Sequence, residues 1–77
     1  PDLIVADPPR AGLGKQAVQH LLCLSAPRLV IVSCDPATLA RDLVPLLAGG
    51  YRIGRLTMVD LFPQTYHIET IVDLVIV

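Results

Sequence analysis

The chain has 77 residues, of which 53% are hydrophobic and 17% are charged, and its formal net charge is −1. This composition is typical of a packed globular segment and excludes an intrinsically disordered chain. No positively charged leader precedes a short apolar run, and no apolar stretch approaches the roughly 20 residues that a membrane span needs. We therefore expect neither a signal peptide nor a membrane partner.

Both ends of the chain have the pattern of buried strands, "DLIVA" at residues 2–6 and "DLVIV" at residues 73–77. Strands with continuous apolar runs need cover on both faces. A chain this short gains only about 3–5 kcal/mol from a single core. We interpret it as one piece of a larger domain, whose oligomeric state the sequence leaves open.

The first predicted elements alternate between strand and helix. Residues 2–6 form a strand that Asp7-Pro8-Pro9 ends, and residues 14–24 form a helix with apolar side chains at helical spacing. Cys23 lies in the apolar "LLCL" segment of this helix, where we expect it to be buried. A second apolar strand covers residues 28–33.

A second helix follows, with Asp35 as N-cap and Pro36 at its first position. It runs to Gly49-Gly50, and Pro45 should bend or interrupt it.

The last predicted elements are two strands, at residues 51–59 and 68–77, joined by a loop at residues 60–67. Their short connection makes them antiparallel. In the first of them, the alternation slips at Gly54-Arg55, which predicts a bulge. The full order, β-α-β-α-β-β, is typical of an α/β fold with parallel pairing and a doubly wound sheet.

Reactive side chains follow two of the predicted strands. In open α/β sheets, ligands bind beyond the carboxyl ends of the parallel strands, and this places Asp7 and Cys34 at one edge. The final loop can bring His67 and Glu69 to the same edge, and alternation puts these two on one face. The helix N-terminus favours the thiolate of Cys34, whereas the carboxylates of Asp35 and Glu69 oppose it, and the sequence leaves this balance open. A carboxylate entering an apolar strand is either paired or functional, and burial suits it to act as a base.

Each of these residues also has a structural interpretation. Cys34 could be a core thiol, Asp7 a turn cap and His67 a hydrogen-bonded residue at the edge of the sheet. Arg10 could contact a phosphate or only an acidic neighbour. The convergence of several reactive groups on one edge is what favours a functional site.

Three segments together resemble a known family: "DPPRAGL", "VSCDPATLARDL" and "DLFPQTYHIET". They are similar to the S-adenosylmethionine-dependent RNA 5-methyluridine methyltransferases, which methylate uracil C5 in tRNA or 23S rRNA. The resemblance covers nearly the whole chain. It implies that residues 1–77 are the C-terminal half of a class I methyltransferase domain with a partial Rossmann-like fold and an antiparallel last strand.

The resemblance also implies site roles and partners. Cys34 matches the nucleophile that adds to uracil C6, Glu69 matches the base that removes the C5 proton, and Asp7 matches a carboxylate beside the cofactor. S-adenosyl-L-methionine is then the cofactor and RNA the partner of a cytoplasmic enzyme, and no metal is expected. The target base would have to leave its stack to reach Cys34.

The chain departs from the family pattern in two ways. Asp35 stands where the family commonly has Asn. The glycine-rich cofactor turn, any RNA-binding domain and an iron–sulfur cysteine cluster are not in this stretch, and its positive charges form no concentrated patch. We therefore expect the chain by itself to be inactive.

Three alternatives remain open from the sequence. The chain could be a non-catalytic folding fragment, or a Cys-His hydrolase that uses Cys34 and His67. It could also belong to an amino-group methyltransferase of the type that carries a DPP motif, which needs no nucleophilic cysteine.

Overall fold

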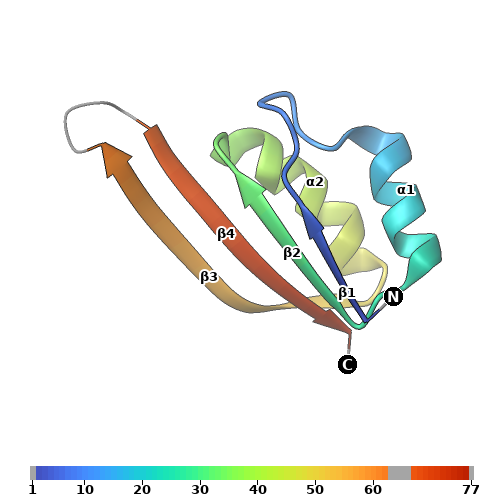
Figure 1. Ribbon diagram of the computed structural model, residues 1–77. Coiled ribbons are helices and arrows are strands. Elements are labelled where there is room, and N and C mark those ends of the chain that lie inside the picture. The colour runs from blue at the N-terminus through green and yellow to red at the C-terminus, as the bar shows by residue number, and fades with distance from the viewer. Residues whose placement is uncertain (1, 63–66, 77) are drawn as a thin grey trace.

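A computed structural model describes residues 2–62 and 67–76 of the chain (Figure 1). The helices and strands follow the predicted β-α-β-α-β-β order. They are β1 (Leu3–Ala6), α1 (Gly14–Leu24), β2 (Arg28–Ser33), α2 (Pro36–Ala48), β3 (Tyr51–Phe62) and β4 (His67–Ile76). Among these described elements, neither helix is long and apolar enough to cross a membrane.

The four strands form one mixed sheet in the order β1-β2-β4-β3. β1 and β2 pair in parallel, whereas β4 runs antiparallel to both β2 and β3. β4 therefore lies between β2 and β3, and the antiparallel last strand that the sequence predicts is confirmed. The α/β class is also confirmed, with β1 and β2 as the parallel pair.

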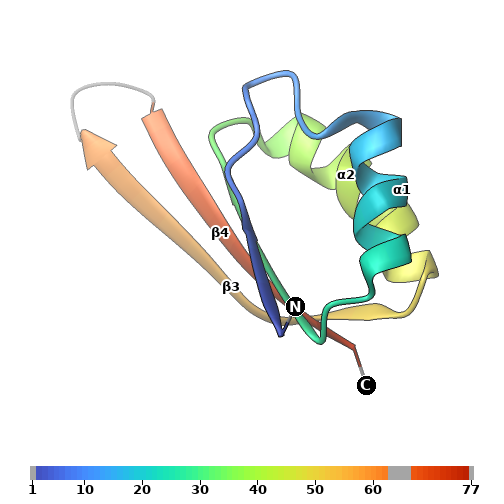
Figure 2. The ribbon, with the colours of Figure 1, turned by 45° about the vertical axis from the view of Figure 1, so that its right-hand side comes forward.

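Both helices cover the same face of the sheet, as the two views show (Figures 1 and 2). α1 connects β1 to β2 and α2 connects β2 to β3, so both connections cross the sheet in the same direction. Because such crossovers are right-handed, both helices then lie on the same face. A doubly wound sheet has helices on both faces. The described residues instead form two layers, one of strands and one of helices.

The core lies between the sheet and the helices. Leu29 and Ile31 of β2 and Val72 and Leu74 of β4 are at most 1% exposed. They pack with buried side chains of the helices and of β3, namely Val18, Leu21, Leu39, Leu46 and Tyr51. The alternate positions of the strands point to the other face, where Val5 is 62% exposed. We call this the open face of the sheet.

The start of α2 is set by Asp35. Its carboxylate oxygen Oδ1 accepts hydrogen bonds from the backbone N–H groups of Ala37 at 2.9 Å and Thr38 at 3.3 Å. Pro36 occupies the first turn, as predicted. The expected interruption at Pro45 is wrong, because α2 continues through that residue to Ala48. Pro45 lies in the last turn, so its missing N–H removes only one bond near the helix end.

The β3–β4 hairpin is longer than the sequence predicts. The bulge at Gly54 is confirmed by a register shift between Ile53 and Arg55. β3 extends to Phe62, and His67 already belongs to β4 because it pairs with Phe62 across a second irregularity. The loop expected at residues 60–67 is therefore shorter, and its residues 63–66 lie outside the described part of the chain.

Tyr51 fixes the start of β3 against the turn before β2. It is 3% exposed, and its hydroxyl group donates a 2.7 Å hydrogen bond to the backbone carbonyl of Ala26. Burial raises the pKa of Tyr51 above its ordinary value of 10.0. The folded state thus binds the hydroxyl proton of Tyr51 more tightly than the unfolded chain does. The contribution of this hydroxyl group to stability is therefore complete below pH about 10, and it is lost as the pH rises through the folded-state pKa.

Replacing Tyr51 with Phe should lower the free energy of unfolding by about 1–3 kcal/mol at neutral pH, because the Ala26 carbonyl stays buried without its donor. Urea unfolding of the wild type and the variant measures this difference, which should shrink above pH about 10. An unchanged unfolding midpoint, or a difference that does not vary with pH, would contradict the assigned role of this hydrogen bond.

Candidate functional site

The carboxyl ends of β1 and β2 lie at the same edge of the sheet (Figure 1). Asp7 follows β1 by one residue, and Cys34 follows β2 by one residue. Both residues therefore lie directly beyond the last paired residues of their strands. Both side chains are exposed, so a ligand at this edge can reach them.

The antiparallel pairing of β2 with β4 brings Glu69 to this edge. Ser33, the last residue of β2, pairs with Thr70, so Cys34 and Glu69 are the next residues of the two segments at this edge. Glu69 also pairs with Val59 of β3, and its side chain is half-buried on the open face. The sheet thus gathers a thiol and two carboxylates, including Asp7, at one edge from three separate segments of the chain.

His67 is the first residue of β4. Its backbone pairs with Phe62. Its side chain lies outside the described part of the structure, so the Cys-His alternative gains no support from it.

Ser33 holds the backbone on both sides of Cys34. Its hydroxyl group accepts a 3.1 Å hydrogen bond from the N–H of Asp35 and donates a 3.0 Å hydrogen bond to the Asp35 carbonyl. Ser33 is 5% exposed, whereas Cys34 is exposed. A buried hydroxyl thus fixes the turn that presents the thiol. The sequence analysis did not predict a role for Ser33. The only sign of such a role in the sequence is that a polar residue ends an otherwise apolar strand.

Cys23 is exposed, so the expectation that it belongs to the core is wrong. Val18 and Leu21 form the buried side of α1. Cys23 is two residues beyond Leu21, about 200° around a helix of 3.6 residues per turn, and therefore faces away from the sheet. The chain has two exposed thiols, of which only Cys34 stands at the sheet edge.

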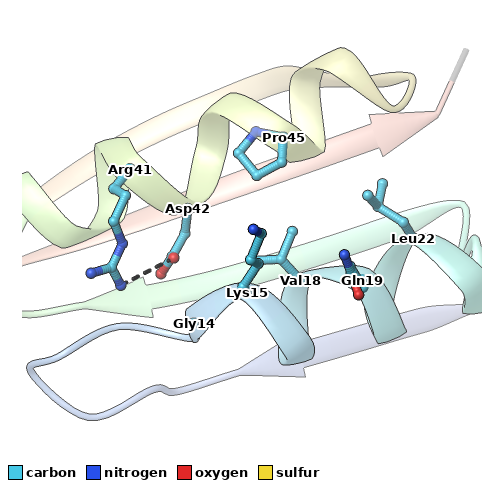
Figure 3. A pocket seen from close by; sticks show the side chains of 8 residues that line it. All are labelled: Gly14, Lys15, Val18, Gln19, Leu22, Arg41, Asp42 and Pro45. Atoms are coloured by element: carbon cyan, nitrogen blue, oxygen red, sulfur yellow. Dashed lines mark hydrogen bonds and ion pairs between the residues drawn. The ribbon is translucent and has the colours of Figure 1, made fainter.

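A groove of about 420 Å³ lies between α1 and α2 (Figure 3). Val18, Leu22 and Pro45 supply apolar walls, and Arg41 and Asp42 form an ion pair at its lining with an Nη2 to Oδ1 distance of 3.3 Å. Asp7, Cys34 and Glu69 do not line the groove. It is therefore separate from the candidate site.

Among the residues that the structure describes, no group of three or more His, Cys, Asp and Glu side chains could hold a metal ion. The residue available to a cofactor at the edge is Asp7. Its exposed carboxylate can accept hydrogen bonds from hydroxyl or amino groups of a ligand at the end of β1.

Comparison with known proteins finds a matching family model and close relatives. The chain matches the family model described as tRNA (uracil-5-)-methyltransferase over residues 2–76. An uncharacterized RNA methyltransferase of Streptomyces coelicolor is 57% identical over 70 residues, which cover 91% of this chain and 15% of that protein. An uncharacterized RNA methyltransferase of Thermotoga maritima is 53% identical over 74 residues, or 96% of this chain and 17% of that protein.

A solved structure has the same fold. The Pyrococcus abyssi tRNA (uracil-54, C5)-methyltransferase, in complex with S-adenosyl-L-homocysteine, superposes with a TM-score of 0.82 at 40% sequence identity. The match covers 96% of this chain and 18% of that one. The chain thus spans less than a fifth of the proteins it resembles. Together with the family match, these likenesses confirm the resemblance seen in the sequence: the chain belongs to the tRNA (uracil-5-)-methyltransferase family.

Proposed function

We propose that the protein carrying this chain transfers a methyl group from S-adenosylmethionine to C5 of a uridine in tRNA or 23S rRNA. The observation that carries the proposal is the β2–β4 register, which pairs Ser33 with Thr70 and so brings the adjacent residues Cys34 and Glu69 to the sheet edge that also holds Asp7. These are the residue types that the family mechanism requires. The bound S-adenosyl-L-homocysteine of the Pyrococcus abyssi enzyme supports the choice of cofactor.

We also propose that residues 1–77 are the C-terminal half of a class I methyltransferase domain with a partial Rossmann-like fold. The parallel β1–β2 pair, with an antiparallel strand inserted beyond it, and the TM-score of 0.82 support this assignment. Because the chain spans less than a fifth of its relatives, the activity is assigned to the whole protein, acting on RNA in the cytoplasm. The 77-residue chain alone should be inactive.

Cys34 is the proposed nucleophile. Uracil C5 is too weakly nucleophilic to take a methyl group by itself. Addition of the Cys34 thiolate to C6 forms an S–C6 bond and moves the C5–C6 double-bond electrons into an enolate, which makes C5 nucleophilic. The exposed position of Cys34 suits this step, since the target base must leave its stack to reach the thiol.

Glu69 is the proposed base. Bound S-adenosylmethionine supplies the electrophilic methyl group that C5 takes up. Glu69 then accepts the proton that C5 still carries, the C5–C6 double bond re-forms, and the Cys34 thiolate leaves C6. A position across the strand pair from the nucleophile lets Glu69 approach the same ring. The exposed carboxylate of Asp7 is placed to bind the cofactor's polar groups beside it.

Replacing Cys34 with Ala in the full-length protein should abolish methylation, because the covalent activation of C5 is lost. The assay follows tritium release from RNA labelled at uridine C5. Cys23→Ala is the matched control, since Cys23 is also an exposed thiol and should be dispensable. Retained methyl transfer in Cys34→Ala, with no tritium released, would favour an amino-group methyltransferase instead.

Replacing Glu69 with Gln should leave addition and methyl transfer possible but slow proton removal by about 10²- to 10⁴-fold. The protein–RNA adduct should therefore accumulate with ordinary uridine substrate. Denaturing gel electrophoresis after incubation with S-adenosylmethionine measures this. A variant that turns over at the wild-type rate, or one that forms no adduct although Cys34 is intact, would remove Glu69 from the role of base.

A further inference from the structure

The loop of residues 10–13, which connects β1 to α1, is held by three polar side chains of α2. The Thr38 hydroxyl group donates to the Arg10 carbonyl at 3.0 Å, and Arg41 Nη2 donates to the Ala11 carbonyl at 2.7 Å. The N–H of Leu13 donates to Asp42 Oδ2 at 2.7 Å. We call these three side chains the α2 clamp. Each bond joins residues that are 28 to 30 positions apart in the sequence.

Asp42 anchors the α2 clamp. It is 4% exposed, and a carboxylate buried to that degree is costly unless it is paired and hydrogen-bonded. It meets this requirement through Leu13 and through its ion pair with Arg41 (Figure 3). Arg41 therefore contacts both the loop and Asp42, which makes the clamp one connected network.

Gly12 lets the loop approach the helix closely. Its N–H donates to the Pro9 carbonyl at 2.8 Å, and its φ of +89° lies in the left-handed region. A Cβ atom there would stand 2.6 Å from Arg41 Nη2 and 2.7 Å from Asp42 Oδ2. A side chain at residue 12 would therefore displace the Arg41 and Asp42 side chains from the positions in which they hold the loop.

The α2 clamp connects the two halves of the candidate site. α2 begins at Pro36, two residues after Cys34, and its first turns carry Thr38, Arg41 and Asp42. On the other side of the contact, Pro8 and Pro9 separate the loop from Asp7. Proline fixes φ and restricts the residue before it, so the segment from Asp7 to the loop is stiff. A displacement of the loop is therefore transmitted to Asp7.

We infer that Thr38, Arg41 and Asp42 are positioning residues, which set the Asp7 carboxylate relative to Cys34 by holding the loop of residues 10–13. This inference rests on the proposed function, in which Asp7 contacts the cofactor. It assigns the polar side chains of α2 to cofactor binding, although they do not themselves lie at the sheet edge.

The test measures binding of S-adenosyl-L-homocysteine to the full-length protein by isothermal titration calorimetry. Asp42→Ala should weaken the affinity by about tenfold, about the loss expected when one hydrogen bond to the ligand is misaligned. Asp42→Asn, which keeps an oxygen that can accept the Leu13 N–H, should recover part of the loss. If Asp42→Ala does not fold, Arg41→Met serves the same purpose, because the Arg41 side chain is 56% exposed.

A double-mutant cycle separates positioning from a general loss of stability. Asp7→Ala should weaken binding by itself, and adding Asp42→Ala, or Arg41→Met, should then weaken it no further. Tyr51→Phe is the control, because it removes a buried hydrogen bond remote from the loop and should leave the affinity unchanged. Additive losses in the double variant, wild-type affinity in the single clamp variants, or an unaffected Asp7→Ala would each overturn the inference.

The outcome can be separated from that of the proposed function. If the cycle shows the expected coupling but the full-length protein releases no tritium from uridine-labelled RNA, the α2 clamp stands and the substrate assignment fails. If tritium is released and depends on Cys34, but the cycle is additive, the function stands and the positioning role fails.

Discussion

The candidate site depends on the antiparallel pairing of β4 with β2. Had β3 paired with β2 instead, the start of β4 would lie one strand further from Cys34. The observed register, with Ser33 opposite Thr70, brings a residue near the C-terminus of the chain to the strand end that carries the thiol. Since side chains alternate along a strand, a slip of one residue would also turn Glu69 to the helix-covered face. Register and strand order together therefore decide whether Glu69, the proposed base, reaches the sheet edge that carries Cys34, the proposed nucleophile.

That register is fixed by the core. Leu29 and Ile31 of β2 face Leu74 and Val72 of β4, and all four side chains are essentially buried beneath the helices. A one-residue slip would expose these apolar side chains and bury the alternate ones, Asp73 among them. The same packing that stabilises the sheet thus sets the spacing of the candidate site. Local hydrogen bonds then refine it, with Ser33 bracketing Cys34 and the α2 clamp holding the loop beyond Asp7.

The sequence predicted the elements well because their boundaries carry local signals. Asp35-Pro36 marks the start of α2, and the slip at Gly54 marks the bulge of β3. The order of the strands and the face that each helix covers were harder to predict from the sequence. An apolar strand has the same sequence pattern whichever neighbour it pairs with. The prediction of a doubly wound sheet followed from the alternation of strands with helices, which does not say which face of the sheet each helix covers. In the described residues the helices cover one face, and Val5 on the other remains exposed.

The site residues divide in the same way. Asp7, Cys34 and Glu69 could be proposed from the sequence because each sits at the end of a predicted strand, where a reactive side chain is not needed for packing. Ser33 and Asp42 were missed, since their partners are backbone groups that no sequence pattern reveals, and the Leu13 partner of Asp42 is 29 residues away. Cys23 was misassigned to the core because the apolar "LLCL" segment conceals which side of α1 faces the sheet.

The most direct test of the uracil-C5 mechanism incubates the full-length protein with S-adenosylmethionine and RNA that carries 5-fluorouridine. The base cannot remove fluorine from C5, so the covalent intermediate should accumulate and survive denaturation. The mechanism predicts that peptide mass spectrometry places the RNA on Cys34, and that Cys34→Ser forms no adduct. Absence of an adduct with tRNA and ribosomal RNA, in a protein that binds the cofactor, would contradict it and return Cys34 to a structural role at the end of β2.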